Sequence, residues 1–420
     1  MKLLFRLGLL GYLFVLFAGP AYSGTATLVA DSNKNGNFAP GGFTVFNAKL
    51  YFAADDGIHG RELWVYDDVN PPGMLPAMVA DIQSGSGSSS PSDFAVFNSK
   101  LYFQANDGIN GAELWVYDGV NPPSMVADIL SGPGSSSPRD LIVFNSKLYF
   151  TDNEYVYLDS ELWVYDGVNP PSVVDAINGY NLNDFTVFNS KLYFAANNIG
   201  YSALWVYDGV NPPSMVTWFG PWTSLSNLIE FRSKLYFYFT YEGDISLYVY
   251  DGVNPPSMVT WFGPLTSGAR NMYMIVFHSR LYFLKNDFAH GEELWSYDGV
   301  NPPSMVADIR ASSYNSDSFV RYMTVFNSKL YFAAYEPING YELWSYDGTN
   351  PPVMEADIRS GPGNSTPKYL TVYNSKLYFS ADDGIHGREL WVFDNNIQPN
   401  PSKLFPFSYQ LLLLKGNTPP

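Results

Sequence analysis

Short apolar segments separated by turn residues run along the whole chain. Between residues 94 and 129, four such segments are rich in β-branched or aromatic residues: Phe94–Phe97, Leu101–Ala105, Glu113–Tyr117 and Met125–Ile129. Asn98 lies between the first two and tolerates the left-handed backbone of a tight hairpin. Pro122 and Pro123 lie between the last two and exclude both helix and ladder hydrogen bonds there. The pattern therefore predicts four antiparallel strands joined by turns.

This four-segment unit recurs eight times. A segment close to VFNSKLYF marks each copy, with its leucine at Leu50, Leu101, Leu148, Leu192, Leu235, Leu281, Leu330 and Leu377. The mean spacing of about 47 residues lies between those of the WD40 and kelch repeats, which form four-stranded propeller blades. We therefore expect an all-β protein, an eight-bladed β-propeller of four-stranded antiparallel blades.

The outermost strands are offset from the other three. Leu28–Asp31 resembles an outermost strand but precedes the first copy, whereas the eighth copy stops after its third segment, Glu389–Asp394. Pairing of these two segments would complete eight blades and leave no open sheet edge. We expect this N-terminal outer strand to close the ring, with Val29 beside Val392. Ser402–Phe407 is the competing candidate.

The two ends of the chain differ from the repeats. Residues 1–23 combine a basic start at Lys2 and Arg6, an apolar run over 7–17 and a small-residue cleavage pattern, which together indicate a signal peptide. We expect residues 24–394 to form a single eight-repeat propeller domain and 395–420 a C-terminal extension. No later stretch approaches the length of a transmembrane span. The expected location is therefore secreted, extracellular or in the cell envelope.

Composition narrows the function. The absence of cysteine excludes disulfide bonds and a lipid-modified cysteine. The net charge of −17 argues against nucleic acid, because that partner requires clustered Lys and Arg. With four histidines and no nucleophile elbow, the chain offers little catalytic machinery, which favours a non-enzymatic role. We expect a monomer without a required cofactor that binds an extracellular glycan or a surface protein.

Six copies contain the tripeptide Glu-Leu-Trp, which begins at Glu62, Glu113, Glu161, Glu293, Glu342 and Glu389. In one copy Asp347-Gly348-Thr349 follows it. In these residues the chain resembles the exported bacterial repeat proteins named for an ELWxxDGT motif and often described as hyalin-like, over almost all of the mature chain. Copies four and five depart from the motif, with Ala203 and Ser246 in place of the glutamate. The resemblance implies an exported β-repeat protein and carries no particular activity.

Residues that recur in the copies are expected to be scaffold, because an active site rarely needs eight equivalent copies. The recurring tryptophan is expected to wedge between neighbouring blades, at Trp64, Trp115, Trp163, Trp205, Trp295, Trp344 and Trp391. An aspartate that opens the following turn is expected to accept backbone N–H bonds, at Asp67, Asp118, Asp166, Asp208, Asp251, Asp298, Asp347 and Asp394. Contact with a ligand is the alternative for both sets.

Function is expected on the rim whose loops vary. The loops between the second and third strands and the links between blades emerge on one rim, and their sequences differ at 83–93, 152–160, 241–246 and 286–292. On that rim, copies four and five replace Ala-Asp-Ile with Thr-Trp-Phe-Gly-Pro. Exposed rings there would stack on sugar faces, so the candidate ligand-binding residues are Trp218, Phe219, Trp222, Trp261 and Phe262. The alternative is that these rings cover under-packed blade edges.

A metal site is a further hypothesis. The segment DDGIHGRELW occurs at both 55–64 and 382–391, in blades that ring closure makes neighbours. Its candidate ligands for a divalent metal are Asp55, His59, Asp382 and His386, with solvated loops of a duplicated module as the alternative. Residues 31–36 match the first half of a calcium-binding loop, but Gly42 stands where the bidentate glutamate belongs. An ordinary turn is the alternative to calcium there.

These observations lead to one leading hypothesis and two rivals. The leading hypothesis is a secreted, non-catalytic binding or adhesion propeller that recognises carbohydrate through the variable loop rim. The first rival is a polysaccharide-acting hydrolase that uses rim carboxylates, because glycoside hydrolysis needs only two acids close in space. The second rival is a purely structural cell-envelope protein.

Overall fold

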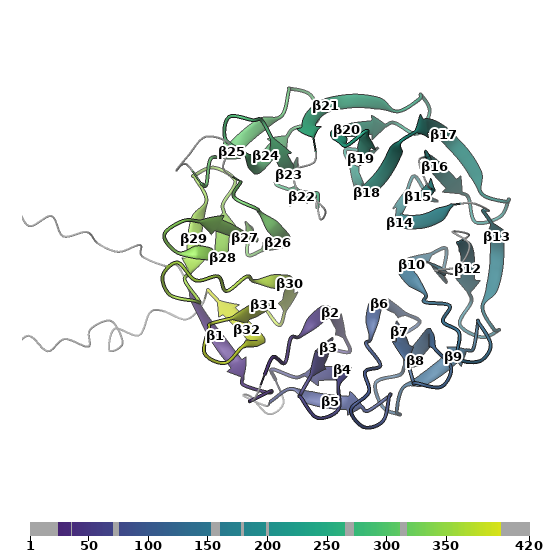
Figure 1. Cartoon of the computed structure of the whole chain (residues 1–420). Helices are drawn as coiled ribbons and strands as arrows, with labels where there is room; N and C mark the ends of the chain where they lie inside the picture. The colour runs from purple at the N-terminus through teal and green to yellow at the C-terminus, as the bar shows by residue number, and fades with distance from the viewer. Residues whose placement is uncertain are drawn as a thin grey trace, which may run out of the picture.

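The computed structural model describes residues 24–395 except 35, 70–74, 153–159, 178–179, 199–200, 265–272 and 311–316. These residues form eight four-stranded antiparallel sheets, arranged as blades around a central axis (Figure 1). The predicted eight-bladed β-propeller is thus confirmed. Residues 1–23, 396–420 and the candidate strand Ser402–Phe407 lie outside the described residues. Within the described part of the chain, no helix is long and apolar enough to cross a membrane.

Seven blades run from their innermost to their outermost strand in chain order, and the eighth takes its outermost strand from the N-terminal end of the fold. Blades one and two contain β2 (Gly41–Phe46), β3 (Lys49–Asp55), β4 (Arg61–Tyr66), β5 (Ala77–Ala80), β6 (Ser92–Phe97), β7 (Lys100–Asn106), β8 (Ala112–Tyr117) and β9 (Ser124–Ala127). Blades three and four contain β10 (Arg139–Phe144), β11 (Lys147–Thr151), β12 (Glu161–Tyr165), β13 (Ser172–Ala176), β14 (Asn181–Phe188), β15 (Lys191–Asn198), β16 (Tyr201–Tyr207) and β17 (Ser214–Pro221).

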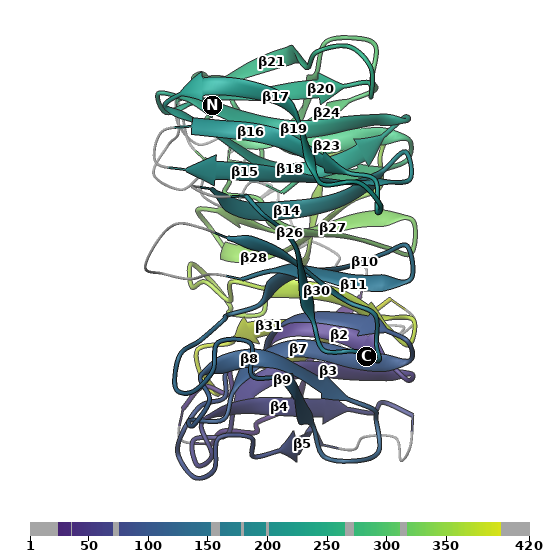
Figure 2. The ribbon, with the colours of Figure 1, turned by 90° about the vertical axis from the view of Figure 1, so that its right-hand side faces the viewer.

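The second half of the ring repeats this plan. Blades five and six contain β18 (Thr223–Phe231), β19 (Lys234–Tyr241), β20 (Asp244–Tyr250), β21 (Ser257–Pro264), β22 (Ile275–Phe277), β23 (Arg280–Asn286), β24 (Glu292–Tyr297) and β25 (Ser304–Ala307). Blades seven and eight contain β26 (Arg321–Phe326), β27 (Lys329–Glu336), β28 (Gly340–Tyr346), β29 (Val353–Ala356), β30 (Lys368–Tyr373), β31 (Lys376–Asp382), β32 (Arg388–Asp394) and β1 (Thr25–Ala30). Loops project from two opposite rims (Figure 2).

The N-terminal strand closes the ring. β1 pairs antiparallel with β32, so the first and last strands of the fold complete one blade, seen as purple beside yellow in Figure 1. Thr27 is the residue opposite Val392, and Val29 lies at a register shift between Leu28, which is opposite Trp391, and Ala30, which is opposite Leu390. The closing strand was therefore predicted correctly, whereas its expected register was two residues off. Val29 and Val392 still pack in one apolar cluster.

Local turn chemistry explains the hairpin between the first two strands of each blade. Asn98 and Ser99 have φ of 47° and 56°, which is the left-handed pair that matches the twist of a two-residue hairpin. The turn after the third strand is built on an aspartate, as expected. Asp118 accepts the backbone N–H groups of Val120 at 2.8 Å and Asn121 at 2.7 Å. These turns form the constant rim of the ring.

Aromatic rings pack between all eight blades. Trp115 belongs to a cluster that includes Phe46 and Tyr51 of the preceding blade, which is the wedge position expected for the recurring tryptophan. A second contact was not anticipated. The tyrosine of each second strand meets an aromatic residue of a neighbouring third strand, with centroids 5.6–6.0 Å apart, in the pairs Tyr51–Tyr117, Tyr102–Tyr165, Tyr149–Tyr207, Tyr193–Tyr250, Tyr236–Tyr297, Tyr282–Tyr346, Tyr331–Phe393 and Tyr378–Tyr66.

The glutamate of the Glu-Leu-Trp tripeptide holds the link to the next blade. Glu113 is completely buried, and its carboxylate accepts the backbone N–H of Ile129 at 3.0 Å and that of Ser136 at 2.9 Å. The Ser136 hydroxyl donates a third bond, 2.6 Å long. Equivalent bonds surround Glu62 and Glu342. The link between these blades is therefore held by hydrogen bonds to a side-chain carboxylate and not by pairing with a neighbouring strand.

Candidate functional site

Blades four and five differ from the others on the variable rim, which carries the loops between second and third strands and the links between blades. Their third strands carry Ala203 and Ser246 in place of the glutamate. There the outermost strand stays paired to its end, as Tyr201 with Pro221 shows in blade four. β17 and β21 are eight residues long, whereas β5, β9, β25 and β29 have four each. Backbone pairing thus replaces the carboxylate anchor.

These extended strands expose alternate aromatic residues. Trp218 is 54% exposed and Trp261 is 46% exposed, whereas Phe219 and Phe262 pack against apolar clusters. Phe262 is 3% exposed and stacks on Phe283 with ring centroids 5.1 Å apart. Neighbouring residues in a strand face opposite sides, so only the tryptophan of each pair faces solvent. Phe219 and Phe262 are blade-core residues, in contrast to their predicted place on the ligand surface.

Trp222 forms the whole link between β17 and β18. Its side chain is 68% exposed, and its carbonyl accepts the backbone N–H of Glu242 at 3.1 Å. The backbone of Trp222 has φ of 62°, a left-handed conformation that is unusual for a bulky residue. Strain of this kind costs about 1–3 kcal/mol and concentrates at functional sites. The exposed ring is therefore held in place by a tight and strained connection.

Two aromatic residues that were not singled out in the sequence lie beside these tryptophans. Tyr201 stacks on Trp218, with centroids 6.1 Å apart and an interplanar angle of 22°. Phe288 lies 5.8 Å from Trp261 and has φ of 65°. It occupies a position that is a left-handed glycine in other copies, such as Gly57. An aromatic residue at a glycine position was the signal that would have identified it.

Together these side chains form a surface that we call the aromatic rim. Trp261 donates its indole N–H to the Asp244 carboxylate at 3.2 Å, which fixes the orientation of the ring. Every member is at least 38% exposed: Tyr201, Trp218, Trp222, Tyr241, Trp261 and Phe288. They come from blades four to six and all lie on the variable rim. Apolar ring faces with polar neighbours can take a flat, partly apolar ligand.

The four predicted metal ligands have local partners. Asp55 accepts the backbone N–H of Gly57, and Asp382 that of Gly384, each at 2.7 Å. The Nδ1 atoms of His59 and His386 lie 2.8 and 2.7 Å from Asp56 and Asp383 in their own turns, and these hydrogen bonds raise the pKa of each histidine. No group of three or more acidic or histidine side chains converges in the described part of the chain.

The candidate calcium loop over residues 31–36 is also held by local bonds. The Asn33 amide nitrogen donates to the carbonyls of Asn37 at 3.2 Å and Asp55 at 3.1 Å, while the Asn33 carbonyl accepts the N–H of Gly36 at 3.1 Å. Asn35 lies outside the described residues. Asn33 thus serves to join the closing strand to the second strand of blade one, as an ordinary turn would.

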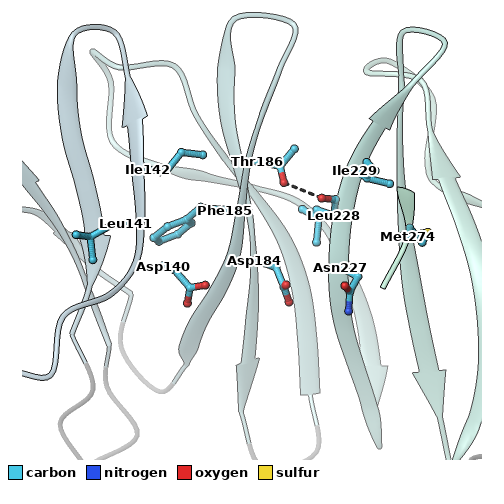
Figure 3. A pocket seen from close by; sticks show the side chains of 10 residues that line it. All are labelled: Asp140, Leu141, Ile142, Asp184, Phe185, Thr186, Asn227, Leu228, Ile229 and Met274. Carbon is cyan, nitrogen blue, oxygen red and sulfur yellow. Dashed lines mark hydrogen bonds between the residues drawn. The ribbon is translucent and has the colours of Figure 1, made fainter. Parts of the chain in front are cut away.

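A second site, absent from the sequence analysis, lies where the innermost strands of blades three to five face the central axis (Figure 3). It is a cavity of about 320 Å³ in which Asp140, Asp184 and Asn227 lie at equivalent positions of adjacent strands. Asp140 donates its backbone N–H to Asp93 of blade two at 3.2 Å. The sequence signal was an aspartate at one position of the first segment in copies two, three and four, as Asp93, Asp140 and Asp184.

The electrostatics of this cavity are unusual. Burial, followed by the negative charges of Asp184 and Asp93, raises the pKa of Asp140 to about 6. Burial also raises the pKa of Asp184, against hydrogen bonds from Asn227 and Asn183. The backbone is left-handed at three equivalent aspartates, with φ of 54–57° at Asp93, Asp140 and Asp184. Each of them lies at a bulge in the innermost strand of its blade. Chemically, the cavity offers two carboxyl groups of which one titrates close to neutrality.

Comparison with known proteins identifies the fold and no family. No known family model matches the chain, and no curated protein matches its sequence. The Dos1 propeller superposes with a TM-score of 0.56 at 11% identity, over 88% of this chain and 95% of that chain. A Mycobacterium tuberculosis puromycin-hydrolyzing peptidase gives 0.51 at 11% identity, and a prolyl endopeptidase 0.51 at 14%. This chain covers 61% and 50% of those two peptidases, respectively, and they cover 87% and 74% of it. At these identities the similarity shows the propeller fold alone.

Proposed function

We propose that the protein is an exported, non-catalytic propeller of the ELWxxDGT type that binds carbohydrate through its aromatic rim, as a recognition or adhesion module. The observation that carries the proposal is the exposure of Trp218, Trp222 and Trp261 on adjacent blades. Large exposed aromatic side chains that cluster on a soluble fold mark an interaction surface. Packing does not explain these rings, since the phenylalanines beside them fill the blade core.

Carbohydrate is the ligand class that this surface fits best. Sugar rings carry apolar C–H faces bordered by hydroxyl groups, and they stack on tryptophan and tyrosine faces. The rim supplies the stacked pair of Tyr201 and Trp218, and Trp261 with an acidic acceptor at Asp244. These groups lie on paired strands and a one-residue link, so little side-chain or loop ordering is needed on binding. The net charge of −17 makes a nucleic acid a poor alternative.

The test compares two pairs of substitutions in the same blades. Trp218→Ala with Trp261→Ala removes ring faces from the variable rim. Val210→Ala with Val253→Ala is the matched control, because both valines are 85% exposed and lie in turns of the constant rim. We expect the mature protein and the valine variant to be retained on one or more polysaccharides of a neutral and acidic panel. The tryptophan variant should lose that retention while melting at an unchanged temperature. Equal retention of both variants would contradict the proposal.

A second candidate function rests on the central cavity. Asp140 has a pKa near 6, and Asp184 faces the same cavity, which are the ingredients of an acid and base pair for glycoside hydrolysis. This hydrolase would release reducing sugar from a polysaccharide, and Asp140→Asn would abolish the release. Binding without release in the wild-type protein would favour the recognition module. Export is tested separately, by detection of a chain beginning near Gly24 outside the cell.

A further inference from the structure

A cavity of about 440 Å³ lies on the variable rim between blades six, seven and eight. Its walls are Arg310, Phe319, Tyr335, Tyr341, Asn364 and Thr366. Arg310 follows the outermost strand β25, whereas Tyr335 and Tyr341 pair across β27 and β28. The cavity thus lies one blade beyond Phe288, on the same rim, and is independent of the central one.

Arg310 has a counterpart one blade further along the ring. Arg359 occupies the equivalent position after β29, and its guanidinium lies 3.9 Å from the carboxylate of Asp382. Tyr335 of blade seven is equivalent to Asp382, since both are the seventh residue of their second strand. The guanidinium of Arg310 therefore faces an aromatic ring, 4.9 Å from its centroid. Blade seven has lost the carboxylate that its neighbour provides.

The hydrogen-bond donors of Arg310 are only partly used. Nη1 donates to the backbone carbonyl of Asp317 at 3.3 Å, whereas the buried Nε has no hydrogen-bond partner among the described residues. A buried guanidinium N–H without an acceptor is unfavourable unless a ligand supplies one. Asn364 accepts the Tyr341 backbone N–H through Oδ1 at 2.9 Å, which leaves its amide N–H groups as donors. The polar lining is therefore rich in donors and matches an acceptor.

Phe319 adds a second aromatic wall. Its φ is 50°, at a position where the other blades carry the smaller Ala39, Ser90, Ser137 and Thr366. The left-handed backbone is common to these positions, but a bulky side chain on it is unusual. Phe319 lines the cavity together with Arg310 and Tyr335, so the cavity combines a cation with two aromatic side chains.

We infer that this cavity binds the carboxylate of an acidic sugar, a uronate unit of the glycan, and this rests on the proposed carbohydrate function. Guanidinium groups bind carboxylates through paired, charge-assisted N–H bonds. The rings of Phe319 and Tyr335 take the apolar face of the sugar, and Asn364 and Thr366 bond to its hydroxyl groups. With a net charge of −17, the remaining surface repels an acidic glycan, so Arg310 supplies the selectivity.

The experiment measures the affinity of the full chain for an oligogalacturonate and for its neutral methyl ester by calorimetry. The variants are Arg310→Gln, Tyr335→Asp and, as the matched control, Arg359→Gln. We expect the wild type to prefer the acid. Arg310→Gln should bind the acid about tenfold more weakly and the ester unchanged. Tyr335→Asp should also lose the preference for the acid, because it gives Arg310 the internal partner that Arg359 has in Asp382, and it should weaken ester binding as well, since it removes a ring that contacts the sugar. Arg359→Gln should keep the preference.

The other possible results distinguish failure of the uronate site from failure of the aromatic rim. Equal affinity of the wild type for acid and ester overturns it, as does an equal loss in Arg310→Gln and Arg359→Gln. Binding of peptides with a free C-terminal carboxylate, without binding of the uronate, overturns the sugar assignment. The proposed aromatic rim fails separately, if Trp218→Ala with Trp261→Ala leaves ester binding intact. Loss of the acid preference in Arg310→Gln would then still support the cavity.

Discussion

Ser136 donates two hydrogen bonds to Glu113, from its backbone N–H at 2.9 Å and from its hydroxyl at 2.6 Å. Glu113 belongs to the third strand of blade two, and Ser136 lies in the link that leads to blade three. The carboxylate is completely buried, so these bonds are shielded from water. The relative position of neighbouring blades thus depends on a side chain as well as on ring packing.

Glu113→Ala should lower the free energy of unfolding by about 3–5 kcal/mol, because it removes the carboxylate that accepts three hydrogen bonds from Ile129 and Ser136. Ser136→Ala should lower it by only about 1 kcal/mol, since one bond is lost. Urea denaturation followed by tryptophan fluorescence measures both. Ala203 of blade four provides the reciprocal control: Ala203→Glu should also destabilise the fold, because this buried position lacks the donors of the other blades. A neutral Glu113→Ala variant would show that packing alone sets the link.

The fold was predictable because its determinants are local. Strand alternation, the Asn98 hairpin and the Asp118 turn act within a few residues, and similar segments recur along the chain. The role of Glu113 was not predictable, since its acceptor sites are filled by residues 16 and 23 positions away. The segment around Phe262 was misjudged for another reason. Its rings were all expected to be exposed, whereas the segment continues β21, whose alternation turns Phe262 inward.

The candidate sites also combine features that follow from local sequence with contacts between residues far apart in the chain. The exposure of Trp218 and Trp261 follows from strand alternation once β17 and β21 are recognised as strands. The pair Asp140 and Asp184, by contrast, comes from the innermost strands of two separate blades, which the ring places side by side. Arg310 and Tyr335 likewise come from neighbouring blades. Contacts of this kind depend on the ring geometry, although an alignment of the repeats would place Tyr335 where blade eight has Asp382.

Stability should be greatest in mild acid. Burial raises the pKa of Glu293 to about 8 and those of Glu342 and Glu389 to about 7, although hydrogen bonds to each carboxylate oppose the shift. Because these values exceed the ordinary 4.5, the folded state binds more protons, and stability should fall as pH rises from about 5 to 8. Turn aspartates act in the opposite sense. Asn side chains lower the pKa of Asp208 and Asp251 to about 2, so their contribution is lost as pH falls below about 4.

Thermal unfolding from pH 3 to 9 measures this profile. Glu293→Gln imitates the protonated side chain, so its melting temperature should vary less between pH 5 and 8 than that of the wild type. Asp298→Asn in a turn of the constant rim is the control and should leave that part of the profile unchanged. A melting temperature that rises from pH 5 to 8 would mean that the buried glutamates stay ionised in the folded protein.

Trp222→Gly should stabilise the fold and weaken ligand binding. Glycine adopts a φ of 62° without steric cost, and the Trp222 ring is 68% exposed, so little packing is lost. We expect the free energy of unfolding to rise by about 1 kcal/mol and retention on the bound polysaccharide to fall. Trp222→Ala removes the ring and keeps the strained backbone. This variant should weaken retention on the polysaccharide without raising the free energy of unfolding. A loss of stability in Trp222→Gly would identify the ring as a packing element.

A covalent bond between the two ends of the fold should stabilise the ring. Thr27 lies opposite Val392 in the pairing of β1 with β32, and the chain has no cysteine to compete. Thr27→Cys with Val392→Cys should form an internal disulfide and raise the free energy of unfolding by about 3–5 kcal/mol, because the bond closes almost the whole chain into a loop. The disulfide should make the protein migrate faster on a non-reducing gel. Reduction should abolish both the faster migration and the gain in the free energy of unfolding. Among the described strands, β1 is the one that covers the edge of β32. Formation of intermolecular dimers instead would therefore show that β1 leaves the ring, and that unfolding begins at the eighth blade.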